Sequence, residues 1–235
     1  MAHQLVSAPL KLYDANIFYP FQLPFAYSET SIANGILGAP IVWLTDNPIL
    51  ALNSLLLLSF VVSGFGVYLL VVDLTDSVAS GMIAGLIFAF SPYRVDRLVH
   101  IAYISTEWLP LVFYSLRRLL IAPTIRWAIG YGVFLTLAFL SSFLYAYMLI
   151  LEIGGYLVAF VAWRPRLLLN RRAIGLFLAP TVVASALLVA AALPSLEVAR
   201  LYGFERAISE AEYWSARPIN YLAVTAINRT WLHVA

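Results

Sequence analysis

The sequence PILALNSLLLLSFVVSGFGVYLLVV occupies residues 48–72 and contains no charged residue. A helix of these 25 residues would be about 37 Å long, whereas the hydrocarbon core of a bilayer is roughly 30 Å thick. The stretch therefore predicts a transmembrane helix. Further apolar stretches of the same kind follow it along the chain.

The composition of the whole chain agrees with this prediction. Of the 235 residues, 63% are hydrophobic and 11% are charged, whereas soluble domains contain about 25% charged residues. The net charge of +2 is too balanced to indicate a nucleic-acid partner, and the absence of cysteine excludes disulfides, thiolate metal sites and cysteine nucleophiles. We expect an integral membrane protein whose surroundings are a lipid bilayer.

Proline, serine and charged residues divide the apolar part of the chain into segments. The expected spans are residues 48–72, 78–91, 101–121, 127–141, 142–163 and 174–193. Pro110 should kink the third span, and Pro194 should end the sixth. Ser141 and Ser142 should separate the fourth span from the fifth. The sequence thus predicts an all-α fold, a polytopic transmembrane helix bundle with about six spans in residues 48–194.

The two ends of the chain are more polar than the bundle. Residues 1–47 contain three acids and four prolines, which predicts a loop with short helices. Residues 31–45 are apolar but too short and too rich in glycine and proline to cross, so we expect a juxtamembrane helix or a re-entrant segment there. Residues 195–235 form a polar C-terminal segment.

The arginines predict the orientation in the cell membrane. The turns at residues 117–126 and 164–172 contain seven arginines and no acid, and two spans separate them, so both turns lie on the same side. The positive-inside rule makes this side cytoplasmic, although Asp73 and Asp76 fall on it as well. The N-terminal loop, residues 92–106 and the C-terminal segment are then expected on the outer face of a multi-pass protein.

Asp14 and Glu29 are the candidate catalytic residues of the N-terminal loop. They lie among tyrosines and phenylalanines, including Tyr13 and Tyr19, and acids with aromatic rings are typical of sugar sites. Carboxylates accept hydrogen bonds from hydroxyls or hold a divalent ion, and aromatic rings stack on the sugar. The alternative is structural, with Asp14 in an Asx turn and Glu29 in the first turn of a helix.

Arg94, Arg97 and His100 form a second candidate group, because cations at the outer membrane boundary suit a lipid-linked phosphate. The alternative is interfacial anchoring, with Tyr93 and Tyr103 in the aromatic belt. His100 lies seven residues before Glu107, so the two share a helix face if the third span begins early. Such a pair has the chemistry to bind a metal or exchange a proton. Candidate metal ligands are Glu29, His100 and Glu107.

Several of these stretches resemble the polytopic membrane glycosyltransferases of the GT-C superfamily. They are YDANIFYP at residues 13–20, AYSE at 26–29, FSPYR at 90–94, His100, and WLP at 108–110. The resemblance implies sugar transfer from a polyprenyl-phosphate donor to an acceptor on the outer face, by an inverting displacement that an acid of the first outer loop assists. It implies that Asp14 is the general base, Glu29 a second carboxylate or metal ligand, and the Arg94 region the site of the donor phosphate.

The chain departs from the family pattern in three places. The pattern begins with an additional transmembrane helix and an acidic motif in the first outer loop, and neither stands before Lys11. It also continues through further helices, whereas this chain ends at Ala235, and Glu107 stands where an amide is expected. The resemblance therefore predicts a piece of such a transferase, in which Asp14 substitutes for the usual general base.

Two other functions remain open on the sequence alone. A transporter or flippase needs a polar pathway through the bundle, for which the sequence offers Asn53 and Glu152, an acid near mid-depth of the fifth span. A non-catalytic membrane subunit is the second alternative.

Overall fold

The computed structural model describes residues 1–15, 17–165, 170–203 and 207–215, and within these residues it contains helices and no strand. Four stretches are long and apolar enough to cross a membrane. They are α3 (Pro48–Thr75), the stretch Val78–Asp96 that comprises α4 (Val78–Ala89) and α5 (Pro92–Asp96), α9 (Phe143–Trp163), and α10 (Arg171–Tyr202). The expected all-α helix bundle is therefore confirmed, and the four long apolar stretches fit a membrane protein.

Shorter elements complete the described fold. They are α1 (Ala2–Ser7), the 3-10 turns η1 (Pro9–Lys11) and η2 (Pro24–Ala26), α2 (Ile32–Thr45), α6 (Ile101–Ile104), α7 (Trp108–Ile121), α8 (Ile125–Ser141) and α11 (Ile208–Trp214). The helices α2 and α8 are apolar but have only 14 and 17 residues. As expected, residues 31–45 form a helix and α8 is separated from α9 at Ser142, whose hydroxyl accepts a hydrogen bond from the Tyr145 N–H.

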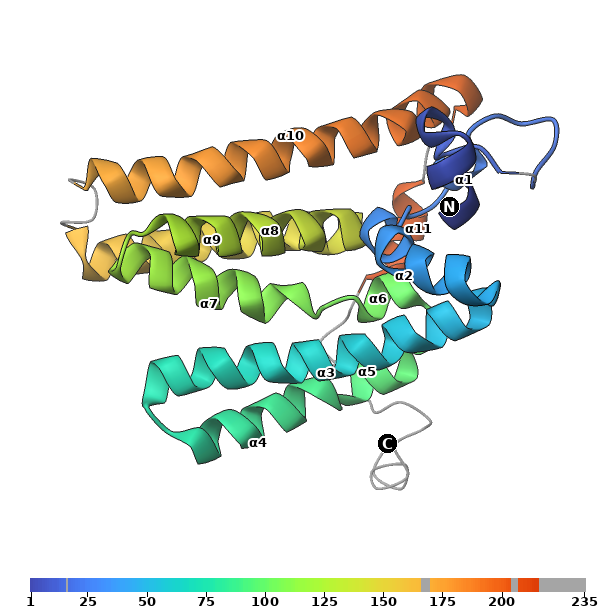
Figure 1. Cartoon of the computed structure of the whole chain (residues 1–235). Coiled ribbons are helices and arrows are strands. Elements are labelled where there is room, and N and C mark those ends of the chain that lie inside the picture. Colours follow the sequence, from blue (N-terminus) through green and yellow to red (C-terminus); the bar gives the residue numbers. More distant parts are fainter. Residues whose placement is uncertain (16, 166–169, 204–206, 216–235) are drawn as a thin grey trace.

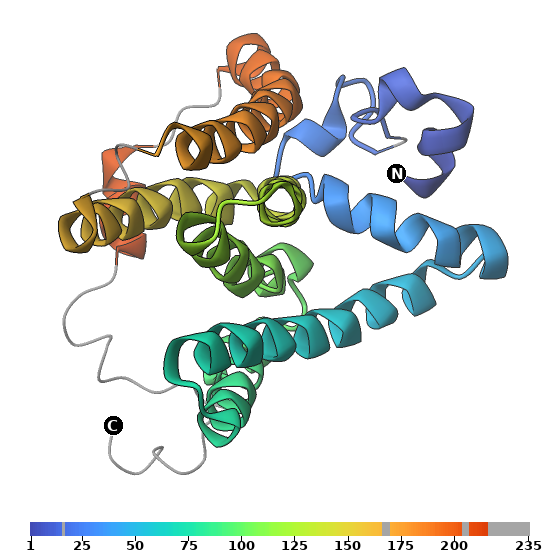
Figure 2. The same cartoon turned by 60° about the vertical axis from the view of Figure 1, so that its left-hand side comes forward.

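The long helices run side by side, so the bundle has two ends (Figures 1 and 2). One end contains the α3–α4 turn, the α7–α8 turn, the end of α9 and the start of α10. We call it the arginine end, because Arg117, Arg118, Arg126, Arg164, Arg171 and Arg172 belong to it. The other end, the loop end, contains residues 12–29, 90–107 and 141–143. The two arginine-rich turns thus lie at the same end of the molecule.

Helix α7 lies inside the bundle and provides much of the core. Val112 and Leu116 of α7 are fully buried, and they pack in one cluster with Leu135 of α8 and Leu149 of α9. The helix α3, in contrast, exposes large apolar side chains at four-residue intervals, at Leu57, Val61 and Phe65. Such a stripe on one face of a helix suits contact with lipid.

Glycines allow α3 and α4 to approach each other closely. A Cβ atom added to Gly85 would lie 2.6 Å from the carbonyl oxygen of Gly64. No side chain fits at this distance, so the two backbones are in direct contact at Gly85, as is common where membrane helices cross.

Two helix boundaries differ from the expectation. The third span does not begin near Ile101, because the backbone leaves the helix between α6 and α7. Pro110 is consequently in the first turn of α7, where its missing N–H removes no helical hydrogen bond and no kink arises. The sixth span does not end at Pro194, since α10 continues through this proline to Tyr202.

Asp73 links helices at the arginine end. Its carboxylate accepts hydrogen bonds from Arg117 Nε at 2.7 Å and from Arg118 Nη1 at 2.8 Å. One of the two acids that opposed the orientation assignment is therefore neutralised by two of the arginines that favoured it.

Candidate functional site

The loop of residues 12–29 is closed on itself and attached to α10. The Phe25 N–H donates to the Tyr13 carbonyl oxygen at 3.1 Å and closes the loop. The Tyr13 hydroxyl, whose pKa burial raises, donates to the carbonyl oxygen of Ala191 near Pro194. The Gln22 N–H donates to the Tyr202 hydroxyl at 3.0 Å. The loop is therefore docked along the last turns of α10.

Aromatic rings extend the attachment of this loop to Tyr202. The rings of Phe21 and Tyr27 both meet the Tyr202 ring edge to face, with centroids 5.4 and 5.6 Å apart, and Phe18 stacks on Tyr27. Tyr19 does not take part, because its side chain is 95% exposed. Of the two tyrosines expected to bind substrate, Tyr13 is held against α10 and Tyr19 projects into the surroundings.

Asp14 is half-buried at the start of this loop. Its backbone N–H donates to the Lys11 carbonyl oxygen at 3.1 Å. Among the residues that the structure describes, its carboxylate has neither a hydrogen-bond donor nor an ion-pair partner. Its neighbour Asn16 lies outside these residues, so the Asx-turn alternative stays a prediction.

Glu29, in contrast, has both carboxylate oxygens engaged. Oε2 accepts a hydrogen bond from the Ser142 hydroxyl at 2.9 Å, and Oε1 accepts one from the Leu144 N–H at 2.8 Å. The acid thus lies at the N-terminus of α9, where a negative charge satisfies free backbone donors and the helix dipole. It stabilises a helix, but a different one from the helix that the sequence suggested.

Arg94 does not face outward, so the expected outward cationic patch lacks it. The side chain is 2% exposed, and its guanidinium donates to Ser59 Oγ at 2.9 Å and to Thr106 Oγ1. The guanidinium carbon lies 4.9 Å from the ring centroid of Phe60. Arg94 therefore fixes the segment between α5 and α7 to the middle of α3.

Glu107 belongs to the same buried cluster. The Ser59 hydroxyl lies 2.8 Å from Glu107 Oε2 and from the Ile104 carbonyl oxygen, and it donates toward both. Burial raises the pKa of the Glu107 carboxyl, while its own backbone N–H, the Ser59 hydroxyl and the Arg94 guanidinium act in the opposite direction. The Ser59 hydroxyl therefore links the Arg94 guanidinium to the Glu107 carboxyl.

The expected metal ligands are not gathered in one place. His100 is exposed and Glu107 is 4% exposed, and the helix break between α6 and α7 removes the shared face that the sequence suggested. The Glu29 carboxylate accepts hydrogen bonds at the N-terminus of α9. No group of three or more His, Asp or Glu side chains that would hold a metal ion occurs in the described part of the chain.

Arg97 and His100 form the exposed part of the cationic group. The Arg97 guanidinium lies 3.7 Å from Asp96 and 6.0 Å from the ring centroid of Tyr103. The His100 ring meets the Tyr103 ring edge to face, with centroids 5.4 Å apart. Both side chains are exposed at the loop end of the bundle.

Tyr145 connects this exposed group to the buried residues, and the sequence did not single it out. Its hydroxyl donates to the Tyr103 carbonyl oxygen and lies 3.5 Å from the Tyr93 hydroxyl. It is in the first turn of α9, next to the serine that binds Glu29. The signal in the sequence was a tyrosine three residues after Ser142, close to the predicted break.

The two residues that would support a transporter lie at the surface of the bundle. Asn53 of α3 and Glu152 of α9 are both exposed. Neither lines a pathway through the described helices.

Comparison of the chain with protein-family models, with curated proteins and with solved structures finds no match.

Proposed function

We propose that this chain is a GT-C-like membrane glycosyltransferase, or a piece of one, that transfers a sugar from a polyprenyl-phosphate donor to an acceptor on the outer face of the cell membrane. The observation that carries this proposal is the gathering of candidate residues at one end of the bundle. The loop with Asp14 and Glu29 is attached there to α9 and α10, at the same end as the exposed Arg97 and His100.

The arrangement supports different roles for the two acids. Asp14 is the general base, because its carboxylate is free of described partners and general base catalysis needs a carboxylate that can accept a proton from the acceptor hydroxyl. Glu29 holds the loop against α9 and so positions Asp14. The acceptor oxygen then attacks the anomeric carbon, the bond from this carbon to the phosphate oxygen breaks, and polyprenyl phosphate leaves with the electron pair.

The cations have separate roles as well. Arg97 and His100 are exposed and bind the donor phosphate, which arginine contacts with several parallel donors. Arg94 acts through the cluster with Ser59 and Thr106, which holds the segment of Arg97 and His100 in place. Tyr93 is 48% exposed beside this segment and contacts the donor at the membrane boundary.

The orientation belongs to the same proposal. The bundle crosses the membrane about six times, through α3, the α4–α5 stretch, α7, α8, α9 and α10. The arginine end faces the cytoplasm, because loops rich in arginine remain on that side. The loop end then faces outward, where lipid-linked donors are used.

A transfer assay in membranes tests the proposal. Membranes from cells that express the chain receive radiolabelled polyprenyl-phosphate hexose or pentose, and label in acceptors is compared with membranes from cells that carry the empty vector. Transfer above the vector level supports the function, and its absence with every donor contradicts it. Glu29→Gln and Ser142→Ala should lower turnover by similar factors if Glu29 acts by positioning the loop.

A further inference from the structure

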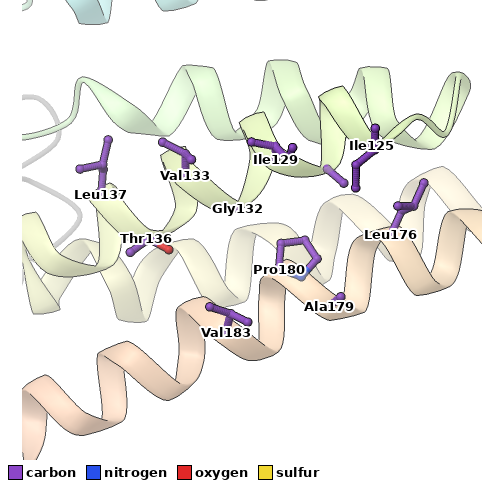
Figure 3. A pocket seen from close by; sticks show the side chains of 11 residues that line it. Ile125, Ile129, Gly132, Val133, Thr136, Leu137, Leu176, Ala179, Pro180 and Val183 are labelled. Atoms are coloured by element: carbon purple, nitrogen blue, oxygen red, sulfur yellow. The ribbon is translucent and has the colours of Figure 1, made fainter.

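An apolar groove of about 530 Å³ lies between α8 and α10 (Figure 3). Ile125 and Ile129 line it from α8, and Leu176 and Val183 line it from α10. Among the described residues that line it, Thr136 alone has a polar side chain. Ile125, Ile129 and Val183 are 63%, 59% and 64% exposed. The groove is therefore open along the outside of the bundle.

The contact between the two helices gives the groove its floor. A Cβ atom added to Gly132 would lie 2.7 Å from Pro180 Cβ, so the helices touch at this point. On the inner side, the Tyr131 hydroxyl lies 3.1 Å from Thr181 Oγ1, and the Tyr131 ring stacks on Phe177. A closed contact of this kind leaves a shallow channel on the outer side.

The length of the groove suits one acyl chain. It runs along α8 from Ile125 to Leu137 (Figure 3), which is about 18 Å at the helical rise. One leaflet contributes about half of the roughly 30 Å hydrocarbon core. A single chain of a lipid in the leaflet at the arginine end therefore fills the groove from one end to the other.

Two arginines stand at the arginine end of the groove, one on each helix. Arg172 precedes Leu176 by four residues, so it lies on the groove face of α10. Arg126 follows the groove-lining Ile125 in the first turn of α8, and its guanidinium carbon lies 5.4 Å from the ring centroid of Trp127. Both are exposed, and among the described residues neither has an ion pair. Arg117 differs, because Asp73 neutralises it. Positive charge without a counterion is thus concentrated at the mouth of the groove.

We propose that this groove binds an anionic phospholipid, with one acyl chain between α8 and α10 and the phosphate between Arg126 and Arg172. The charge at the mouth selects an anionic headgroup over a zwitterionic one, and the apolar lining holds the chain. This site lies at the opposite end of the bundle from the proposed transfer site and does not depend on it.

Native mass spectrometry of the full chain in detergent, titrated with phosphatidylglycerol or phosphatidylcholine, tests the proposal. Each basic residue near a membrane surface contributes about fivefold to the binding of anionic lipid, so two arginines should give a preference of about 25-fold for phosphatidylglycerol. The double variant Arg126→Gln/Arg172→Gln should lose most of this preference. The matched control Arg164→Gln, an exposed arginine at the same end but at the end of α9, should keep it.

A second pair of variants tests the apolar part. Ile129→Trp fills the groove and should lower the binding of both lipids, whereas Ile150→Trp, at an exposed position of α9, should not. Equal binding of the two lipids, or an equal loss of preference in Arg164→Gln, overturns the proposal. Self-association of the protein would also overturn the proposal if Ile129→Trp abolishes it and phosphatidylglycerol does not displace it. The occupant of the groove is then a second copy of the chain.

Discussion

The Leu144 N–H donates a hydrogen bond of 2.8 Å to the carboxylate of Glu29, a residue 115 positions earlier in the chain. Through this contact and the one to Ser142, an acid of the N-terminal loop completes the first turn of α9. Glu29→Ala should therefore destabilise the protein by about 1 kcal/mol, as the loss of a helix cap does. The midpoint of thermal unfolding in detergent measures this change.

Ser142→Ala is the matched variant for this contact. It removes the Ser142 hydroxyl, which donates to one Glu29 oxygen and also accepts from the Tyr145 N–H. The double variant with Glu29→Ala should lose less stability than the sum of the two single variants, because both disrupt the same helix start. Strictly additive losses would show that the two residues act separately.

The buried cluster of Arg94 and Glu107 predicts an unequal response to substitution. Arg94→Met removes the cation that opposes the burial penalty on the Glu107 carboxyl, together with the donors to Ser59 and Thr106, and should cost about 3 kcal/mol of stability. Glu107→Gln keeps an acceptor for Ser59 and should cost less. The double variant should be more stable than Arg94→Met alone, as unfolding in detergent will show. A double variant less stable than Arg94→Met contradicts this view of the pair.

The contact between α3 and α4 predicts a difference between two glycines. Gly85→Ala places a methyl group 2.6 Å from the Gly64 carbonyl oxygen, so the helices must separate, whereas an added Cβ at Gly154 has no neighbouring atom within 4 Å. Gly85→Ala should lower stability by about 2 kcal/mol, which is typical of overpacking. Gly154→Ala should leave stability unchanged or raise it. Equal thermal midpoints for the two variants would refute the close contact.

The absence of cysteine makes the orientation directly measurable. Tyr19→Cys, at the loop end, should react with a membrane-impermeant maleimide on intact cells. Thr124→Cys, in the turn between α7 and α8 at the arginine end, should react only after the membrane is permeabilised, because arginine-rich turns stay in the cytoplasm. The opposite pattern would place the loop end inside the cell.

The local pattern of the sequence was sufficient for much of the bundle. The charge-free run that begins at Pro48 became α3, with the Asn47 side chain capping its start at 2.9 Å, and the Ser141–Ser142 pair became the break between α8 and α9. These features depend on residues close together in the chain. Pro110 and Pro194 were misinterpreted because the effect of a proline depends on where its helix begins and on what packs beside it.

The candidate site was less predictable, since it depends on contacts between distant segments. An arginine in the short segment after Pro92 is typical of the membrane interface, and nothing near it in the sequence indicates that Ser59 and Thr106 bury Arg94. The attachment of Glu29 to α9 and of Tyr13 to α10 likewise joins residues more than 100 positions apart. Hydrophobic periodicity carries no information on such pairs.

The turnover of Asp14→Asn relative to the unmodified chain, in membranes supplied with radiolabelled polyprenyl-phosphate sugar, tests the central claim most directly. General base catalysis contributes about 10²- to 10⁴-fold, so the variant should lose at least about a hundredfold of the transfer rate. Asp46→Asn, an exposed acid at the end of α2, is the matched control and should keep the full rate. A transfer rate in Asp14→Asn equal to that of Asp46→Asn would contradict the assignment of Asp14 as the base.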